Sequence, residues 1–178
     1  MTPDVAMTMS LLERTPASVD SLLRGLPDAW TMRNEGERTW TVYEVMEHLV
    51  HCERVNWMAR VRMIVEEGEA RAFAPLDREV HAALGTPLGR LLDDFSQLRK
   101  GNLVQLGEMR VGAEELGRRG LHPTLGPVTL SELLATWAVH DMTHLHQISR
   151  VLAHQYREAV GLWRVNLGVL QCNGRSAG

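Results

Sequence analysis

Apolar residues recur along the chain at the three- and four-residue spacing of amphipathic α-helices, and no strand-length segment alternates strictly between apolar and polar residues. The pattern therefore predicts an all-α protein. The main helices are expected at residues 3–25, 41–67, 87–109 and 129–159. The first is either two pieces, 3–14 and 16–25, or one helix bent at Pro16. A shorter helical piece is expected at residues 113–119, and the glycine- and proline-rich residues 120–127 are predicted to form a loop.

Two kinds of capping signal mark the predicted helix starts. A threonine followed by proline can place threonine at the N-cap and proline in the first turn, where its missing N–H is tolerated. A threonine followed three residues later by glutamate is a capping box, in which the two side chains satisfy free backbone amides reciprocally. The first signal occurs at Thr2, Thr15 and Thr86, and the second pairs Thr41 with Glu44 and Thr129 with Glu132.

The connections between the predicted helices differ in length. Residues 28–40 form a polar connection that leads into the second helix. Residues 68–85 form a longer connection than helical bundles usually contain, where about 2–8 residues are typical. We therefore expect a long crossover between the second and third helices, running from one end of a four-helix bundle to the other.

Length and composition narrow the functional classes. A chain of 178 residues with 44% hydrophobic residues most simply forms one domain, 1–178, in which 161–178 is a C-terminal tail packed on the bundle or a dimer partner. It contains no run of about 18 apolar residues and no signal peptide, so we expect a cytoplasmic protein without a membrane span. The net charge is −3 and the positive charges are dispersed, which argues against nucleic-acid binding. Cys52 and Cys172 are too few for a disulfide framework and are expected to be thiols.

The last predicted helix carries two histidines, His140 and His144, at metal-ligand spacing. Side chains four residues apart on a helix lie about 40° apart around its axis, so both imidazoles can point into one volume. Asp141 lies between them, and an unpaired carboxylate on a buried face is costly. We take the buried seam to be Leu134, Trp137, Asp141, His144, Ile148 and Val151. Three ionisable groups on this face indicate a site, although such a histidine pair also arises by chance in helices.

A catalytic metal usually has three protein ligands and keeps positions open for water or substrate. Helix phase favours His48 of the second helix as the third ligand; the alternative is a histidine bonded to a neighbouring carbonyl. Cys52, one turn further on, is either a thiolate ligand, a reactive thiol or a small buried hydrophobe. His51 and His146 point to solvent, and His154 lies about 15 Å along the helix axis from His144. His81 and His122 fall in predicted loops, from which either can reach the mouth of the site.

Other metal patterns fit less well. A di-iron carboxylate bundle needs Glu-x-x-His pairs, which this sequence lacks. The segment from His140 to His144 has the spacing of a zinc peptidase motif, but Asp141 stands where that motif has the longer glutamate base. A peptidase is therefore a minor alternative.

The chain resembles the DinB-like superfamily, which includes YfiT-like proteins. The most specific resemblance combines the stretch from Trp40 to Leu49, with its His-Leu end, and the His-Asp-x-x-His-x-x-Gln-Ile motif ending at Ile148. The Thr15-Pro16 pair, residues 95–102, and the His122-Pro123 and 126–130 segments extend it over nearly the whole chain. The resemblance implies a four-helix bundle of up-down-down-up order with a metal held by three histidines. By position these are His48, His140 and His144.

These patterns lead us to expect a metal-dependent enzyme acting on a small-molecule substrate. Zn²⁺ or Ni²⁺ suits three imidazoles best, and Mn²⁺ or Fe²⁺ also fits. Relatives implied by the resemblance include transferases that use low-molecular-weight thiols and a thiol-dependent maleylpyruvate isomerase, so thiol transfer to an electrophile is preferred over hydrolysis. The alternative is a non-catalytic, metal-stabilised module of the stress response.

Two further expectations concern Asp141 and the tail. Asp141 is predicted to face inward and accept a proton from an imidazole, as an outer partner of the metal or an acid/base group. The alternative is a carboxylate at the bundle edge paired with Arg99 or Arg150. An apolar tail beyond Trp163 and the resemblance together predict a homodimer.

Overall fold

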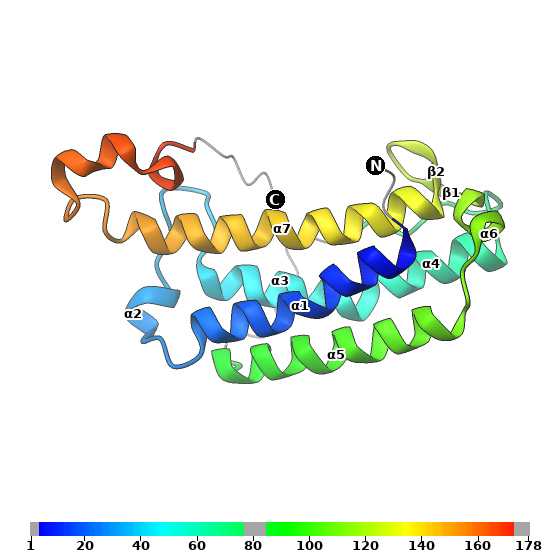
Figure 1. Ribbon diagram of the computed structural model, residues 1–178, viewed down its shortest axis with the longest axis horizontal. Helices are drawn as coiled ribbons and strands as arrows, with labels where there is room; N and C mark the ends of the chain where they lie inside the picture. The colour runs from blue at the N-terminus through cyan, green and yellow to red at the C-terminus, as the bar shows by residue number, and fades with distance from the viewer. Residues whose placement is uncertain (1–3, 77–84, 173–178) are drawn as a thin grey trace.

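The computed structural model describes residues 4–76 and 85–172. Within these ranges, long helical segments lie side by side as a bundle (Figure 1). They are α1 (Val5–Leu23), α3 (Val42–Val55) continued by α4 (Trp57–Glu66), α5 (Leu88–Glu108) and α7 (Leu130–His154). The predicted helix start at Thr2 and the candidate His81 lie outside the described residues. The prediction of a mainly helical bundle is confirmed.

The bundle has a simple order in space. Helices α1 and α3 each pack against both α5 and α7. The colours in Figure 1 show α1 and α7 running one way along the bundle, whereas α3, α4 and α5 run the other way. Helix α4 ends and α5 begins at opposite ends of the bundle, as the predicted crossover between them requires.

The two predicted capping boxes begin their helices, but the described threonine-proline pairs do not: α5 has Pro87 at its N-cap, without a side-chain cap from Thr86. In both predicted boxes the threonine hydroxyl accepts the glutamate N–H at 3.1 Å, while the glutamate carboxylate accepts the threonine N–H at 2.7 Å. Helix α1 instead begins after Asp4, whose carboxylate accepts the Met7 N–H, and it continues through Pro16. Thr15 is therefore inside a helix and does not cap one.

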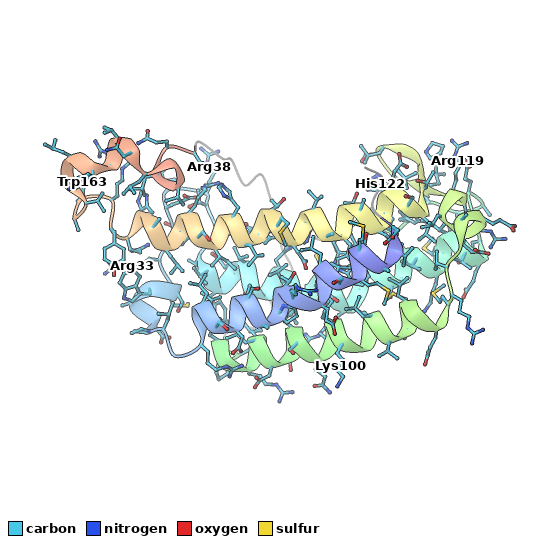
Figure 2. The ribbon with its side chains drawn as sticks, in the orientation of Figure 1. Arg33, Arg38, Lys100, Arg119, His122 and Trp163 are labelled. Atoms are coloured by element: carbon cyan, nitrogen blue, oxygen red, sulfur yellow. The ribbon has the colours of Figure 1, made fainter. Side chains whose placement is uncertain are left out.

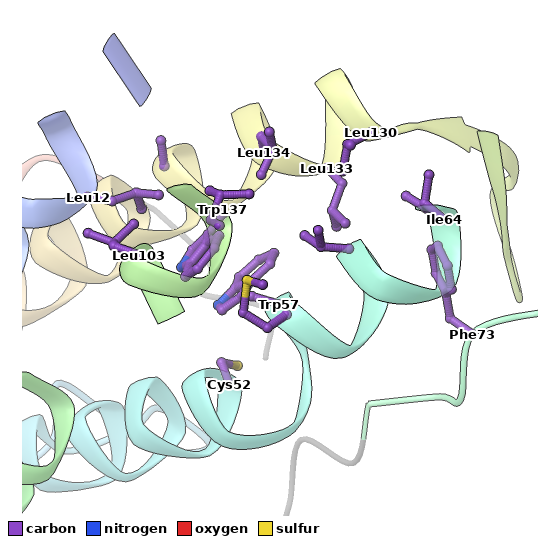
Figure 3. Close-up of a cluster of buried hydrophobic side chains, with 14 residues drawn as sticks. Leu12, Cys52, Trp57, Ile64, Phe73, Leu103, Leu130, Leu133, Leu134 and Trp137 are labelled. Carbon is purple, nitrogen blue, oxygen red and sulfur yellow. The ribbon is translucent and has the colours of Figure 1, made fainter. Parts of the chain in front are cut away.

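The second predicted helix is interrupted at Asn56, which ends α3 and precedes α4. The apolar spacing of the second helix, continued from Leu49 and Cys52 as one helix, predicts a buried Ala59, but α4 buries Trp57 and Val61, among others, and Ala59 is exposed. The break rotates Trp57 into the core, where its ring stacks on Trp137 with centroids 5.6 Å apart (Figure 3). Burial of a large aromatic surface thus outweighs the continuity of the helix.

Residues 119–129 form a β-hairpin, so the all-α prediction and the predicted loop are both wrong here. Strand β1 (Arg119–His122) pairs antiparallel with β2 (Gly126–Thr129). Gly120 is buried against α4, and a Cβ there would lie 2.7 Å from Ile64 and 2.8 Å from Phe73. The strands are four residues long, too short for alternation to reveal them, and tertiary contacts with Ile64 and Phe73 hold them in place.

Four shorter elements complete the described chain. They are α2 (Asp28–Thr31) within the predicted polar connection, α6 (Ala113–Gly117) where a short helix was expected, and two 3₁₀ turns, η1 (Gly161–Asn166) and η2 (Gly168–Leu170). Helix α7 ends at His154, earlier than the predicted residue 159. Turn η2 packs on α7, whereas Leu162 and Trp163 remain 93% and 74% exposed. Homodimerisation through this tail stays a prediction.

The core confirms the predicted seam of α7, whose six residues are all buried. Two apolar clusters fill the bundle, one at the hairpin end around Trp57 and Trp137 and one at the opposite end around Phe95 and Ile148. Within the described ranges, no helix is long and apolar enough to cross a membrane. The histidines predicted as ligands lie between these clusters.

Candidate metal centre

Three imidazoles from α3 and α7 converge on one point. The Nε2 atom of His140 lies 3.1 Å from Nε2 of His48 and 3.1 Å from Nε2 of His144. Metal–nitrogen bonds of about 2.0–2.1 Å put neighbouring ligand nitrogens around one ion about 3.0–3.4 Å apart. The spacing of the three side chains therefore fits the ligands of a single divalent ion, although metal binding itself stays a prediction.

Aromatic side chains hold these rings in place. Trp40 lies beside His48, with ring centroids 4.9 Å apart, and its ring is parallel to that of His144 at 6.2 Å. Trp57 meets His140 edge-on at 5.0 Å. Because these rings leave little room for rotation, the imidazoles are oriented before any ligand arrives.

The neighbours of His144 favour its metal-binding tautomer. The carbonyl oxygen of Gln147 lies 2.8 Å from Nδ1 of His144 and can only accept, so Nδ1 carries the proton and Nε2 presents a lone pair. Burial lowers the pKa of His144, opposed by the Gln147 hydrogen bond and the charge of Asp141, and keeps the ring neutral. Gln147 is the last polar residue of the motif that carries the family resemblance.

Cys52 adds a fourth donor atom. Its Sγ lies 3.4 Å from Nε2 of His48, and the donor atoms of His48, Cys52 and His140 all lie within 4.8 Å of one another. The thiol is fully buried. The structure thus groups Cys52 with His48 and His140, while His144 contacts this group through His140, and it supports the interpretation of Cys52 as a metal ligand more than the sequence did.

A cavity of about 470 Å³ opens beside the imidazoles. His48, His140 and His144 form part of its wall, and Cys52 does not. The remaining wall is mainly apolar and includes Trp40, Trp57, Phe73, Leu76, Val128 and Leu133. Cavities of this size and composition typically bind small molecules.

The other histidines fall into two groups. His122 sits on the hairpin and lines the same cavity, at the end of the bundle where Figure 2 shows it. His146 is exposed, while His51 and His154 are half-buried, and none of the three lines the cavity or joins the donor group.

Asp141 faces inward, as predicted, but its partner is an arginine. Both carboxylate oxygens accept from Arg99, at 2.7 and 3.0 Å, and both residues are only 1% exposed. The alternative prediction of a pair with Arg99 is therefore confirmed, whereas its placement of Asp141 at the edge of the bundle is wrong. Arg150 instead pairs with Glu35. Whether Asp141 serves the metal centre stays a prediction.

Arg99 also ties together residues that the sequence did not single out. It donates to Glu53 at 2.8 Å and to the Leu12 carbonyl at 2.7 Å, while Glu53 accepts from the Trp137 indole at 3.0 Å and from Asn102 at 2.9 Å. Burial alone lowers the pKa of Arg99, but the hydrogen bonds to Asp141 and Glu53 outweigh it, so the net pKa is raised. The only sequence signal for Glu53 was a charged residue directly after Cys52.

The lowered pKa of His144 predicts a pH dependence of stability. Below its ordinary pKa of 6.5 the unfolded chain takes up a proton at His144, whereas the folded protein does so only at lower pH. The free energy of unfolding of the metal-free protein should therefore fall as pH drops below 6.5, by up to about 1.4 kcal/mol per pH unit from this group. Denaturant unfolding at several pH values should show a shallower slope for His144→Gln.

The exposed His146 on the same helix provides the matched control. The His146→Gln protein should keep the wild-type slope. Equal slopes in the wild type and in His144→Gln would contradict the assignment of a neutral, buried His144.

The fold has a known counterpart. The structure is similar to that of YfiT from Bacillus subtilis, which is described as a probable metal-dependent hydrolase with an unusual four-helix bundle topology. The TM-score is 0.74 over 86% of this chain and 90% of that one, at 19% sequence identity. Among curated proteins, none matches this chain.

The match to a family model identifies the family of this chain. The model described as the DinB superfamily matches residues 11–148, which is most of the chain and includes His48, His140 and His144. The chain therefore belongs to the DinB superfamily.

Proposed function

We propose that this protein is a metal-dependent enzyme in which His48, His140 and His144 bind a divalent ion. The observation that carries the proposal is the convergence of three Nε2 atoms at the wall of a cavity of about 470 Å³. A metal held there is accessible to a small molecule. Closed structural sites are instead surrounded by protein ligands.

Zn²⁺ and Ni²⁺ are the metals that suit this donor set best, because both bind imidazole and Zn²⁺ also binds thiolate well. When bound, the ion acts as a Lewis acid that activates water or a thiol for attack near neutral pH. The protein orients the ligands through Trp40 and Gln147 and restricts water access through the apolar cavity wall.

Hydrolysis is the reaction that we favour. The likeness to YfiT, a probable metal-dependent hydrolase, supports this choice over the thiol transfer preferred from the sequence resemblance. Thiol transfer uses the same site and the same ion. The two reactions separate in an assay on activated esters and amides, because only transfer requires an added low-molecular-weight thiol for turnover.

A non-catalytic, metal-stabilised module is the second candidate, and Cys52 is the observation that favours it. With its thiolate added to three imidazoles, four protein ligands close a tetrahedral sphere, as in structural zinc sites. Such a site stabilises the fold without chemistry. The location of Cys52 outside the cavity wall and the exposure of the three imidazoles to the cavity favour the catalytic role.

The metal content should depend on three imidazoles. Replacement of His48, His140 or His144 by alanine removes one of three ligands, so each purified variant should lose most of its bound metal. Atomic emission or mass spectrometry of dialysed protein measures this. His51→Ala and His146→Ala are the controls and should retain wild-type metal content; loss of metal from these proteins, with retention in His48→Ala, would refute the assignment.

Cobalt substitution tests the role of Cys52. If Sγ binds the ion, the Co²⁺ protein should show a thiolate charge-transfer band in the near ultraviolet, and Cys52→Ser should abolish it. Cys172→Ser, an exposed thiol, is the matched control. A thiolate band together with no exchangeable water on the metal would favour the structural role. A site with exchangeable water, with or without the band, supports the enzyme.

Asp141 should strengthen metal binding although it contacts Arg99. Its negative charge raises the basicity of His144, so Asp141→Asn should weaken metal affinity by about 10–100-fold. It should also lower the free energy of unfolding by about 3–5 kcal/mol, because a buried charge loses its partner. Competition with a chromophoric chelator gives the affinity of the folded protein.

Asp94 provides a control for this prediction, since it pairs with Arg54 and Arg90 near the surface. Asp94→Asn should change the free energy of unfolding by at most about 1 kcal/mol and leave metal affinity unchanged. A folded Asp141→Asn protein with wild-type affinity would reduce Asp141 to a purely structural partner of Arg99.

A further inference from the structure

Arg60 contributes a positive charge to the wall of the cavity. It lies on α4, with its guanidinium carbon 5.2 Å from the centroid of the Phe73 ring, and Figure 3 shows Phe73 beside the end of that helix. Burial lowers the pKa of Arg60, although an arginine remains charged at neutral pH. In the part of the chain that the structure describes, no carboxylate forms a salt bridge with it.

Among the described residues, one acidic side chain lines the cavity, and it is engaged elsewhere. Glu132 lines the cavity, but its carboxylate accepts the Thr129 N–H at 2.7 Å and the Thr129 hydroxyl at 2.9 Å. This contact is the capping box of α7. The guanidinium of Arg60 donates to the Ala74 carbonyl at 3.5 Å, but among the described residues no carboxylate balances its half-buried charge, which favours the binding of an anion beside it.

His122 adds a hydrogen-bond donor to the same wall. Its Nδ1 accepts from the backbone N–H of Leu125 at 3.2 Å and of Thr124 at 3.3 Å. The neutral ring therefore carries its proton on Nε2. Burial lowers the pKa of His122, and the positive charge of Arg60 lowers it further, so the two side chains share one electropositive corner.

Asn56 gives an independent indication of a ligand. It lines the cavity, is 5% exposed, and its Oδ1 has no hydrogen-bond partner among the described residues. The backbone N–H of Arg60 donates to the backbone carbonyl of Asn56 at 3.1 Å, so the two residues are one helical turn apart. Buried polar groups in native proteins are nearly always satisfied, and a bound polar molecule would satisfy this one.

We propose that Arg60, His122 and Asn56 bind an anionic group, such as a carboxylate, at one end of a substrate with an apolar body. Arg60 lies on α4, beyond the helix break at Asn56, whereas His48 lies on α3 and His140 and His144 on α7. The reacting group would lie at the imidazoles, the apolar body against Trp57 and Phe73, and the negative charge at Arg60. This inference rests on the proposed function for the reaction, but anion binding does not require the metal.

The test compares 4-phenylbutyrate with its neutral amide, 4-phenylbutyramide, by isothermal titration calorimetry. Both metal-free and zinc-loaded protein are titrated, because a carboxylate can also bind a metal ion. A charge-assisted hydrogen bond should make the acid bind about 10-fold more tightly than the amide in both forms. Arg60→Gln should abolish the preference and Arg60→Lys should retain part of it.

Two more variants sharpen the test. Asn56→Asp is isosteric and places a carboxylate beside Arg60, so it should remove the preference without removing the arginine. Arg62→Gln is the matched control, since Arg62 is exposed on the same helix and bonds to Gln105; it should bind like the wild type. Circular dichroism confirms that each variant is folded.

The outcomes separate this inference from the proposed function. A preference for the acid only in zinc-loaded protein, the same preference in Arg60→Gln, or no binding of the acid at millimolar concentration overturns the anion site. Acid preference in metal-free protein, together with failure of the wild type to bind metal, retains the anion site and rejects the metal-dependent enzyme.

Discussion

One buried cation, Arg99, connects the four main helical segments of the bundle. Arg99 of α5 donates to the Leu12 carbonyl of α1, to Glu53 of α3 and to Asp141 of α7. Removing these charges from water is expensive, and only the combination of two carboxylates, a carbonyl and one planar guanidinium offsets that cost. Each carboxylate directly follows a donor residue of the candidate metal centre in the sequence. The same interaction that closes the bundle therefore fixes the relative positions of the two helices that bring the imidazoles together.

The cavity has three parts that differ in charge and polarity. Burial keeps the imidazole of His144 neutral, and the Gln147 hydrogen bond fixes its tautomer, which suits a metal ligand. The middle of the cavity is apolar, and Arg60 places a positive charge near the hairpin. A molecule that is polar at both ends and apolar between them matches this arrangement better than a uniformly polar one.

Much of the site followed from local periodicity. The seam of α7 placed His144 and Asp141 inward, and the phase of the second helix selected His48, which the structure brings next to His140. These inferences succeeded because a capped helix of regular geometry fixes which side chains share a face, wherever the helix packs. Cys52 was on the correct face for the same reason, but only its 3.4 Å distance from His48 shows that it lies within reach of the same point.

The sequence by itself determined the helical segments, their caps and the inward face of the histidines, because these depend on residues a few positions apart. Tertiary structure alone decided features that depend on distant partners. The helix breaks at Asn56 because Trp57 stacks on Trp137 of another helix, and the hairpin forms where Gly120 fits against Ile64. Asp141 pairs with Arg99 because the packing of α5 brings that arginine inside. No local pattern encodes such contacts, since they join residues separated by 40 or more positions in the chain.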